Sequence, residues 1–378
     1  MARAHEIGFD LVGITDAAPF VHAQHVFHAR VEAGLLGQWS YGSDAVRQRC
    51  TPTQTLDGAR SIVCTATSYL TEDTPHDPHA PGLRGAVSRY AWGRDYHRVL
   101  RERLEELASF IRFEQPDARC VACVDTGPLV DRAAAVRAGI GWFGKNGNVL
   151  TRDFGSYVFL AELITDLELE PDVPLRKYCG SCAVCVERCP TGAISADGAV
   201  DARRCISDAM QLKGPIPRHL RKAIGNRVWG CDDCQTTCPV NVRKSTTASG
   251  RGDPSFRPLP HAGPSVDLPA MLHMTKSEFR GWFGPTAMAW RGKAVLQRNA
   301  AVALGNSRDR AAVPHLVAAL ADRKPLVRGH AAWALGELGG EDARAALTLL
   351  LESEPDAFVR EEATLALRSA EASARAVA

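Results

Sequence analysis

The segment Cys179-x2-Cys182-x2-Cys185-x3-Cys189-Pro190 decides the fold of the middle of this chain. Its spacing is that of bacterial ferredoxins, in which the first three thiolates bind one [4Fe–4S] cluster and the fourth binds a second cluster. A second run, Cys231-x2-Cys234-x3-Cys238-Pro239, repeats only the last three positions of this pattern. The simplest candidate for the missing cysteine is Cys205, which lies 26 residues before the second run.

The crossing of the fourth cysteine predicts two ligand sets. The first cluster is then bound by Cys179, Cys182, Cys185 and Cys238. The second cluster is bound by Cys189, Cys205, Cys231 and Cys234. Two adjacent clusters pass single electrons, so we expect the rest of the chain to hold the group that those electrons reduce.

Zinc and disulfides are the alternatives for these cysteines. Structural zinc sites also use four cysteines, but they usually combine two separated CxxC pairs rather than a triple run closed by Cys-Pro. Disulfide frameworks are typical of small secreted domains, whereas this chain has 378 residues and shows no signal peptide. Two [4Fe–4S] clusters are therefore the favoured interpretation, with zinc as the main alternative. Outside these runs, Cys120 and Cys123 fall on one predicted strand and point to opposite faces, so they cannot share a metal.

Composition predicts a globular protein of two or three domains. Hydrophobic residues make up 45% of the chain and charged residues 23%, and the net charge is +2. The apolar runs are too short to span a bilayer, and low-potential clusters with free thiols favour a reducing compartment, so we expect the cytoplasm. The charge is unevenly spread, because seven basic residues between Arg203 and Gly230 stand against one acid, Asp208, giving a local +6.

Alternating strand and helix patterns predict an α/β domain over residues 1–170. We expect strands at 9–14, 61–67 and 119–124, helices at 95–113 and 131–138, and a hairpin over 149–163. Residues 171–245 are predicted as a ferredoxin-like two-cluster domain, and 246–285 as a linker. Residues 286–378 repeat a pattern that begins at Arg298, Arg328 and Arg360, with periods of 30 and 32. Repeats of this length predict helix pairs that must stack to bury their apolar faces, as HEAT repeats do.

Two segments of the first domain carry candidate chemistry. Residues 139–146 nearly match the phosphate-binding G-x4-G-K-[ST] loop, but Asn146 replaces the hydroxyl residue and the segment follows a helix rather than a strand. A nucleotide site is therefore rejected, whereas a glycine-rich turn close to another cofactor is reasonable. Asp125 follows a predicted strand at a sharp turn, where an aspartate either caps the turn or faces a ligand.

Four further motifs accompany the cysteine runs and the repeats in a fixed order. They are Ser88-Arg-Tyr-Ala-Trp-Gly-Arg-Asp-Tyr-His97, Val124-Asp-Thr-Gly-Pro128, Ala138-Gly-Ile-Gly-Trp-Phe-Gly-Lys-Asn146 and Gly230-Cys-Asp-Asp-Cys-Gln235. In this combination nearly the whole chain resembles the epoxyqueuosine reductases. The resemblance implies an α/β cobalamin-binding domain of nitroreductase-like architecture, followed by the ferredoxin-like and HEAT-like domains.

The resemblance also implies a reaction, the last step of queuosine synthesis. The epoxide of epoxyqueuosine is reduced at the wobble position of GUN-anticodon tRNAs, with cobalamin (cob(II)alamin and cob(I)alamin) and two [4Fe–4S] clusters as cofactors. Taking an epoxide to an alkene consumes two electrons and two protons and releases water. An electron donor such as a flavodoxin or ferredoxin system is implied too, and we expect a monomer.

The resemblance assigns roles to individual residues. Asp125 corresponds to the family's proton donor, and we expect burial beside the corrin to raise the pKa of this carboxyl. The residues placed near cobalamin are Arg49, Tyr90, Arg94, Asp95, Tyr96, His97, Asn146, Gly147, Asn148 and Ser156. The family binds cobalamin without a protein histidine ligand, so His97 is not expected to bind cobalt.

If the substrate is a tRNA, the basic segment between Arg203 and Gly230 is expected to contact its backbone phosphates, because charge neutralisation of phosphates dominates nucleic-acid affinity. A solvated basic face is the alternative. The residues predicted to bind tRNA are Arg218, Arg221, Lys222 and Arg227. After Cys205 the family usually has an aromatic residue, whereas this chain has Ile206, so the family's contacts at that stretch are not carried over.

Two other functions compete with this one. A cobalamin-dependent reductive dehalogenase predicts a twin-arginine export signal and no HEAT-like tail. An electron-transfer protein that feeds a partner docked on the repeats predicts no corrin in the purified protein and no need for Asp125.

Overall fold

The computed structural model describes residues 1–71, 82–247 and 250–377. The chain divides into two compact units, and each draws on several segments. The first unit comprises Met1–Asp73, Arg94–Arg203 and Asp232–Arg257, and the second comprises Thr74–Gly93, Arg204–Cys231 and Pro258–Ala378. No helix among the described residues is long and apolar enough to cross a membrane.

A four-stranded antiparallel sheet forms the centre of the first unit, in the order β1-β2-β7-β4. Its strands are β1 (Leu11–Asp16), β2 (Ser61–Ser68), β7 (Val158–Thr165) and β4 (Cys120–Cys123). The three predicted strands are confirmed to within two or three residues. The predicted hairpin over 149–163 is wrong, because β6 (Val149–Leu150) pairs with β5 (Trp142–Phe143) whereas β7 pairs with β2 and β4. A central strand such as β7 gains two partners, and local alternation cannot reveal this.

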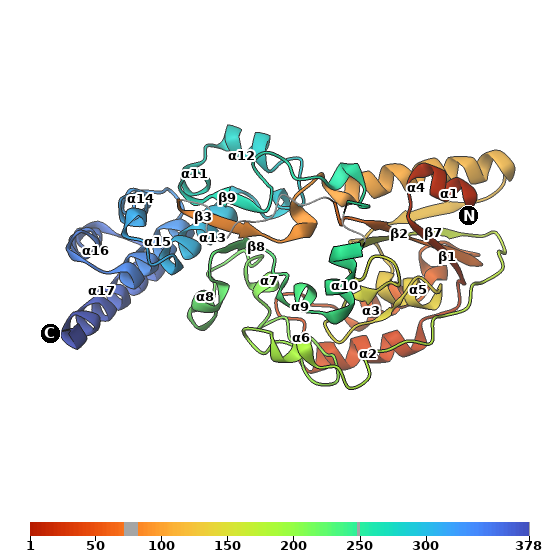
Figure 1. The fold of residues 1–378 in the computed structure, drawn as a ribbon, viewed down its shortest axis with the longest axis horizontal. Helices are drawn as coiled ribbons and strands as arrows, with labels where there is room; N and C mark the ends of the chain where they lie inside the picture. The colour runs from red at the N-terminus through yellow and green to blue at the C-terminus, as the bar shows by residue number, and fades with distance from the viewer. Residues whose placement is uncertain (72–81, 248–249, 378) are drawn as a thin grey trace. The chain divides into compact units, whose positions relative to one another are not determined.

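Two helices cover the sheet, one on either side (Figure 1). Helix α4 (Tyr96–Glu114) begins at Asp95, whose side chain accepts a hydrogen bond from the backbone N–H of His97 at 3.1 Å. Such a cap satisfies one of the free N–H groups at a helix start. Helix α5 (Asp131–Arg137) packs on the face that carries Ile62, Cys64 and Ile164. Both predicted helices are confirmed.

Short elements complete the first unit. Those before the cysteine-rich part are α1 (Ala2–Ile7), α2 (Val21–Glu32), α3 (Ser43–Cys50) and the 3-10 helix η1 (Pro52–Gln54). Those in and after it are α6 (Val184–Glu187), α9 (Asp233–Thr236), α10 (Pro239–Thr247) and η3 (Pro254–Phe256). The helices α6 and α9 have only four residues each, about one turn, which is typical of a fold held by its metal clusters rather than by a large core.

The second unit joins a small sheet to a stack of helices. The sheet has the order β8-β3-β9, made by β3 (Arg84–Val87), β8 (Arg227–Trp229) and β9 (Ser265–Asp267). The predicted linker 246–285 is more ordered than expected, since β9, α11 (Leu268–His273) and α12 (Lys276–Trp282) lie within it. The smaller elements are η2 (Arg89–Ala91), α7 (Ile206–Ala209), α8 (Arg218–Ile224), η4 (Ala289–Arg291) and η5 (Arg310–Ala312).

The predicted repeats form stacked helices (Figure 1). They are α13 (Lys293–Asn306), α14 (Val313–Ala319), α15 (Pro325–Leu338), α16 (Glu341–Ser353) and α17 (Ala357–Val377). Glycines set the closest approaches, because a Cβ at Gly305 would lie 2.7 Å from the Cβ of Ala334. A Cβ at Gly336 would likewise lie 2.6 Å from the Cβ of Ala366. The glycine at the end of each of the first two repeat motifs therefore lets α13, α15 and α17 pack closely in sequence.

Candidate functional site

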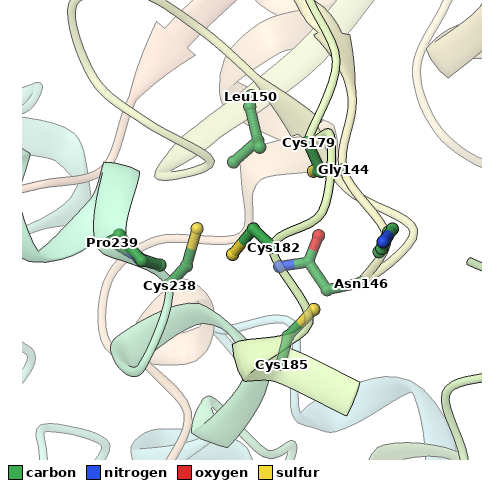
Figure 2. A pocket seen from close by; sticks show the side chains of 9 residues that line it. Gly144, Asn146, Leu150, Cys179, Cys182, Cys185, Cys238 and Pro239 are labelled. Atoms are coloured by element: carbon green, nitrogen blue, oxygen red, sulfur yellow. The ribbon is translucent and has the colours of Figure 1, made fainter. Parts of the chain in front are cut away.

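Four cysteines of the first unit surround one small cavity. Cys179 and Cys182 come from the loop that leads into α6, Cys185 lies in α6, and Cys238 directly precedes α10. Figure 2 shows their side chains around the same space, with the amide of Asn146 beside them. Among the described residues, no three His, Cys, Asp or Glu side chains are spaced to hold a single metal ion. Four thiols spread around a cavity suit a cubane of several atoms better than a single zinc ion.

The electrostatics of these thiols call for a positive partner. Burial raises the pKa of Cys185, and the neighbouring thiols Cys238, Cys179 and Cys182 raise it further. Four thiolates so close together are stable only when bound cations offset their charge.

The second predicted set is spread over both units. Cys189 and Cys234 belong to the first unit, and Cys205 and Cys231 to the second. The Cys189 sulfur accepts a hydrogen bond from the backbone N–H of Ala193 at 3.2 Å. Burial raises the pKa of Cys189, but hydrogen bonds from Thr191, Ala193 and Ile194 outweigh it, so the net pKa is lowered. A thiol that is stabilised as thiolate is prepared to bind iron. The assignment of these four cysteines to one cluster stays a prediction.

Asp125 lies in the loop that joins β4 to α5. Its backbone has φ 48°, in the left-handed region that a non-glycine residue rarely occupies. Such strain is tolerated where the surrounding structure fixes it, and it clusters at functional sites. The side chain is 56% exposed and is not a helix cap, because α5 begins at Asp131. The turn therefore presents the carboxylate outward.

Two side chains from the start of α4 hold this carboxylate. The Tyr96 hydroxyl donates to Oδ2 of Asp125 at 2.8 Å, and Nε2 of His97 lies 3.1 Å from the same oxygen. The other ring nitrogen of His97, Nδ1, lies 2.8 Å from Oδ1 of Asp95. Both ring nitrogens thus lie against carboxylates, and the prediction that His97 does not bind cobalt stays a prediction.

Hydrogen bonds decide the protonation of this group. Burial alone would raise the pKa of Asp125, but hydrogen bonds from His97 and Tyr96 outweigh it and the pKa is lowered. Burial also acts to lower the pKa of His97, yet its bonds to Asp125 and Asp95 raise that pKa to about 9. In the protein alone the pKa of Asp125 is therefore lowered, and the expected rise on burial beside the corrin stays a prediction. At neutral pH the two groups form an ion pair with the proton on His97.

The side chains that hold Asp125 belong to a stack of rings. The ring of Tyr96 stacks on His97 with centroids 4.0 Å apart, and on Phe159 of β7 with centroids 4.3 Å apart and an angle of 5°. A rigid stack keeps the Tyr96 hydroxyl and His97 aimed at one oxygen. Phe159 was not singled out from the sequence, since one aromatic residue in an apolar strand carries no functional signal.

Four of the residues predicted near the corrin support the loops around Asp125. Nη1 of Arg49 donates to the carbonyl oxygen of Gly127 at 2.6 Å, in the Asp125 loop itself. The carbonyl of Gly147 accepts from Nη1 of Arg132 at 2.6 Å, and the Asn148 backbone N–H donates to Oδ1 of Asn146 at 3.3 Å. Asn146 also donates to the carbonyl of Cys234 at 3.1 Å. This glycine-rich turn is thus tied to the cysteine-rich segment.

Other predicted residues lie elsewhere. Ser156 does not fit the predicted cofactor contact, because it is 4% exposed and its hydroxyl is bonded to Gln235 at 3.1 Å and to Asn241 at 2.7 Å. The side chain of Arg94 is 53% exposed and lies 3.8 Å from Glu102. Tyr90 belongs to the second unit.

The residues predicted to bind tRNA are partly neutralised within the second unit. Arg221 does not fit the prediction, because its side chain is 1% exposed and its guanidinium binds both oxygens of Glu362, at 2.9 and 2.7 Å. Arg218 pairs with the same carboxylate and is 39% exposed. Lys222 is 75% exposed and lies 3.1 Å from Glu337. Arg227 donates to the carbonyl of Ile224 at 2.9 Å. The C-terminal helices thus take up part of the +6 charge.

Comparisons with protein families identify three parts of the chain. Residues 49–126 match the family described as "Epoxyqueuosine reductase QueG, DUF1730". Residues 178–241 match the 4Fe-4S double cluster binding domain, and residues 291–368 match HEAT repeats. The iron–sulfur and HEAT predictions are confirmed at this level.

Curated relatives match nearly the whole chain. The epoxyqueuosine reductase of Bacillus subtilis is 40% identical over 356 residues, 93% of this chain and 90% of the relative. That of Bacillus anthracis is 37% identical over 365 residues, 96% of this chain and 94% of the relative.

Solved structures agree with these matches. A selenomethionine-labelled epoxyqueuosine reductase has a TM-score of 0.91 and 39% identity, covering 98% of this chain and 97% of its own. An epoxyqueuosine reductase with an epoxyqueuosine-modified tRNA-Tyr stem loop has a TM-score of 0.90 and 38% identity, with the same coverage. The enzyme of Bacillus subtilis, with its catalytic aspartate loop swung out of the active site, has a TM-score of 0.89 and 38% identity, covering 97% of both chains. This chain belongs to the epoxyqueuosine reductase family.

Proposed function

We propose that this enzyme reduces epoxyqueuosine to queuosine at the wobble position of GUN-anticodon tRNAs, with Asp125 as proton donor. Family membership over nearly the full length supports the reaction, and a related enzyme has been solved with an epoxyqueuosine-modified tRNA stem loop. The observation that carries the role of Asp125 is its outward-facing, left-handed turn, held by Tyr96 and His97. A related structure has a mobile catalytic aspartate loop, and a strained exposed turn suits such a loop.

The proton chemistry of the proposal starts from the ion pair. A proton donor must be within hydrogen-bond reach of the oxygen that leaves. In the protein alone Asp125 is ionised and His97 holds the proton. When the substrate covers the exposed carboxylate, the loss of water favours the neutral form, so the proton moves from His97 to Asp125. Asp125 then donates it to the epoxide oxygen as the carbon–oxygen bond breaks.

Electrons reach the site one at a time through the two clusters. The first is held by Cys179, Cys182, Cys185 and Cys238, and the second by Cys189, Cys205, Cys231 and Cys234. Cobalamin, when bound, supplies a strongly reducing and nucleophilic cobalt centre. Arg49 of α3 and the turn at 146–148 fit such a cofactor. The side chain of Arg49 donates to a backbone carbonyl of the Asp125 loop, and that of Asn146 donates to the carbonyl of Cys234 and lines the cysteine cavity.

The remaining partners follow from the reaction. We propose that Arg218, Lys222 and Arg227 contact the tRNA backbone, and that a flavodoxin or ferredoxin system supplies electrons to a monomeric enzyme in the cytoplasm. Lys222 supports this best, since 75% of its side chain is exposed.

The test is anaerobic turnover on epoxyqueuosine-bearing tRNA. Reconstituted protein with cobalamin and a strong reductant is incubated with the tRNA, and digested nucleosides are read by mass spectrometry. Wild type should convert the nucleoside to one lighter by an oxygen, and Asp125→Asn should reduce the rate by about a hundredfold or more. Asp153→Asn, in another turn of the same unit, is the matched control and should leave the rate unchanged.

Two other outcomes would contradict either the proposed reaction or the proposed role of Asp125. If cluster-replete, cobalamin-loaded wild type does not convert the tRNA, the proposed reaction is wrong and a dehalogenase or electron carrier takes its place. If Asp125→Asn keeps the wild-type rate, the reaction stands and Asp125 is not its acid.

A further inference from the structure

Glu162 is a carboxyl group buried in the middle of the main sheet. It is 0% exposed and lies on β7, between β2 and β4. Its cross-strand partners are Cys64 on β2 and Cys123 on β4, and both are 0% exposed. Thiols and apolar groups cannot replace the water that an ionised carboxylate loses on burial. This position therefore strongly favours a neutral side chain.

Asp131 covers Glu162 from the first turn of α5. Both carboxyl oxygens of Glu162 and Oδ1 of Asp131 are buried, and none of the three receives a hydrogen bond from any donor group in the described part of the chain. The two carboxyl groups lie within hydrogen-bond reach of each other. Two ionised carboxylates have no proton to donate, so this arrangement is satisfied only when at least one of the two carboxyl groups is protonated.

The charges around the pair keep that proton bound at neutral pH. Burial raises the pKa of Glu162 well above its ordinary value, and Asp131 and Asp125 add to the rise. Burial also raises the pKa of Asp131 to about 7, with the Asp125 carboxylate contributing next, while Arg132 and Arg49 oppose the rise. Proteins place pairs of this kind at sites that handle protons.

We propose that Glu162 and Asp131 store a proton and return it to Asp125 during turnover. The inference rests on the proposed function, in which each reduction consumes two protons although Asp125 carries one. Asp131 stands at the opposite end of the same loop, six residues after Asp125. Exposure rises along the three groups, from the buried Glu162 through the half-buried Asp131 to Asp125, which is 56% exposed. A bound substrate would cut Asp125 off from solvent, and after the proton of His97 has been used the stored proton would supply the second one.

The transfer is a single proton step with no change in electrons. The step starts from the pair with both carboxyl groups protonated: the O–H bond of Asp131 breaks as an O–H bond forms on the Asp125 carboxylate, and Asp131 is left ionised beside protonated Glu162. The pair takes one proton back from water after the product leaves. Glu162 and Asp131 act through Asp125, so they are positioning residues.

The first test reads the stored proton directly and needs no turnover. Infrared spectra of the holoenzyme at pH 6.5 should contain the absorption of a protonated carboxyl group that shifts in D2O. Glu162→Gln, which keeps size and hydrogen bonding, should abolish this band, and Asp131→Asn should shift it. Glu168→Gln is the matched control, because Glu168 is 73% exposed and pairs with Arg60. A band that survives Glu162→Gln would overturn the inference.

The second test reads the use of that proton. Glu162→Gln should lower kcat about tenfold with KM unchanged and should move the alkaline limb of the pH–rate profile downward, since these effects separate proton delivery from binding. Glu162→Asp, which restores a carboxyl, should recover part of the rate. A wild-type pH profile in Glu162→Gln would refute proton delivery. If wild type itself fails on epoxyqueuosine tRNA, the proposed function is lost while the infrared band still decides whether the pair holds a proton.

Discussion

Arg298 and Glu162 are both buried charged residues, one in each unit, and their surroundings differ completely. The Arg298 guanidinium is 0% exposed and makes five hydrogen bonds, to the carbonyls of Met210, Leu212 and Gly214 and twice to Asn299. Burial lowers its pKa to about 9, so it remains charged at neutral pH. Glu162 is equally buried but receives no bond from any donor among the described residues.

This difference in hydrogen bonding distinguishes a buried charge that stabilises the fold from a buried ionisable group that is kept for its chemical role. A buried guanidinium whose donors are all used fixes the segment after Cys205 to the first repeat helix. A buried carboxyl that is left without donors costs stability, so its persistence points to a role in chemistry. Stability measurements on matched variants test whether the two buried residues differ in this way.

The largest effect is expected at Arg298. Arg298→Met removes the partner of three buried carbonyls and should lower the free energy of unfolding by about 4 kcal/mol, measured by urea denaturation. Arg323→Met changes an exposed arginine of the same repeat region and should cost less than about 0.5 kcal/mol. Equal losses in the two variants would mean that the Arg298 network adds little.

The opposite sign is expected at Glu162. Glu162→Met keeps the volume and removes an unsatisfied carboxyl, so at pH 8 it should be neutral or stabilising by up to about 2 kcal/mol. The advantage should shrink as the pH falls toward 4.5, the ordinary pKa of glutamate, because the cost of a carboxyl with a raised pKa disappears where the unfolded chain is protonated as well. A loss as large as that of Arg298→Met would show that Glu162 is a structural residue.

A smaller, pH-dependent effect is expected at His97. The pKa of His97 rises from 6.5 to about 9 on folding, so its stabilising contribution is complete below pH 6.5 and is lost as the pH rises through about 9. Because Asp125 is 56% exposed, water screens the pair, and we expect a difference of only about 1 kcal/mol between wild type and His97→Gln at pH 6. Thermal unfolding of both proteins from pH 6 to pH 10 measures it, and parallel curves would contradict it.

The smallest effect on stability is expected at Lys222. Its pair with Glu337 is exposed, so Lys222→Gln should change the unfolding free energy by less than about 0.5 kcal/mol. If Lys222 contacts a tRNA phosphate, the same variant should reduce the salt dependence of stem-loop binding by about one counterion. Titrations at several salt concentrations give the slope, and Lys276→Gln, on a distant helix of the second unit, serves as the control.

Much of the fold and part of the site could be predicted because local chemistry constrains them. Cluster ligands need fixed spacings, and repeats need fixed small residues such as Gly305, so both can be read from the chain. Asp125 was predicted from its turn and its motif, but its lowered pKa depends on His97, which α4 brings from 28 residues away. Partners that are far apart in the sequence and meet only in the folded chain cannot be recognised from the sequence alone.

Arg221 and Glu162 show what could not be predicted. Arg221 belongs to a basic run, yet Glu362, 141 residues further on, buries it. The hydroxyl of Ser156 likewise forms hydrogen bonds with Gln235 and Asn241 in the buried interior. Glu162 left a usable signal, since an acid inside the apolar run Val158–Thr165 of a buried strand is unusual. Its partner Asp131 had no such signal.

The glycines of the repeat helices set how the array can grow. Gly305 lets α15 approach α13, and Gly336 lets α17 approach α15. The corresponding position on α17 is Arg368, directly after the Ala-Leu pair that ends the motif, and it is exposed. A further helix could not approach α17 at the same spacing without displacing this arginine. For a neighbour to approach α17 as closely as α15 approaches α13, this position would need a small residue, which Arg368→Gly would provide.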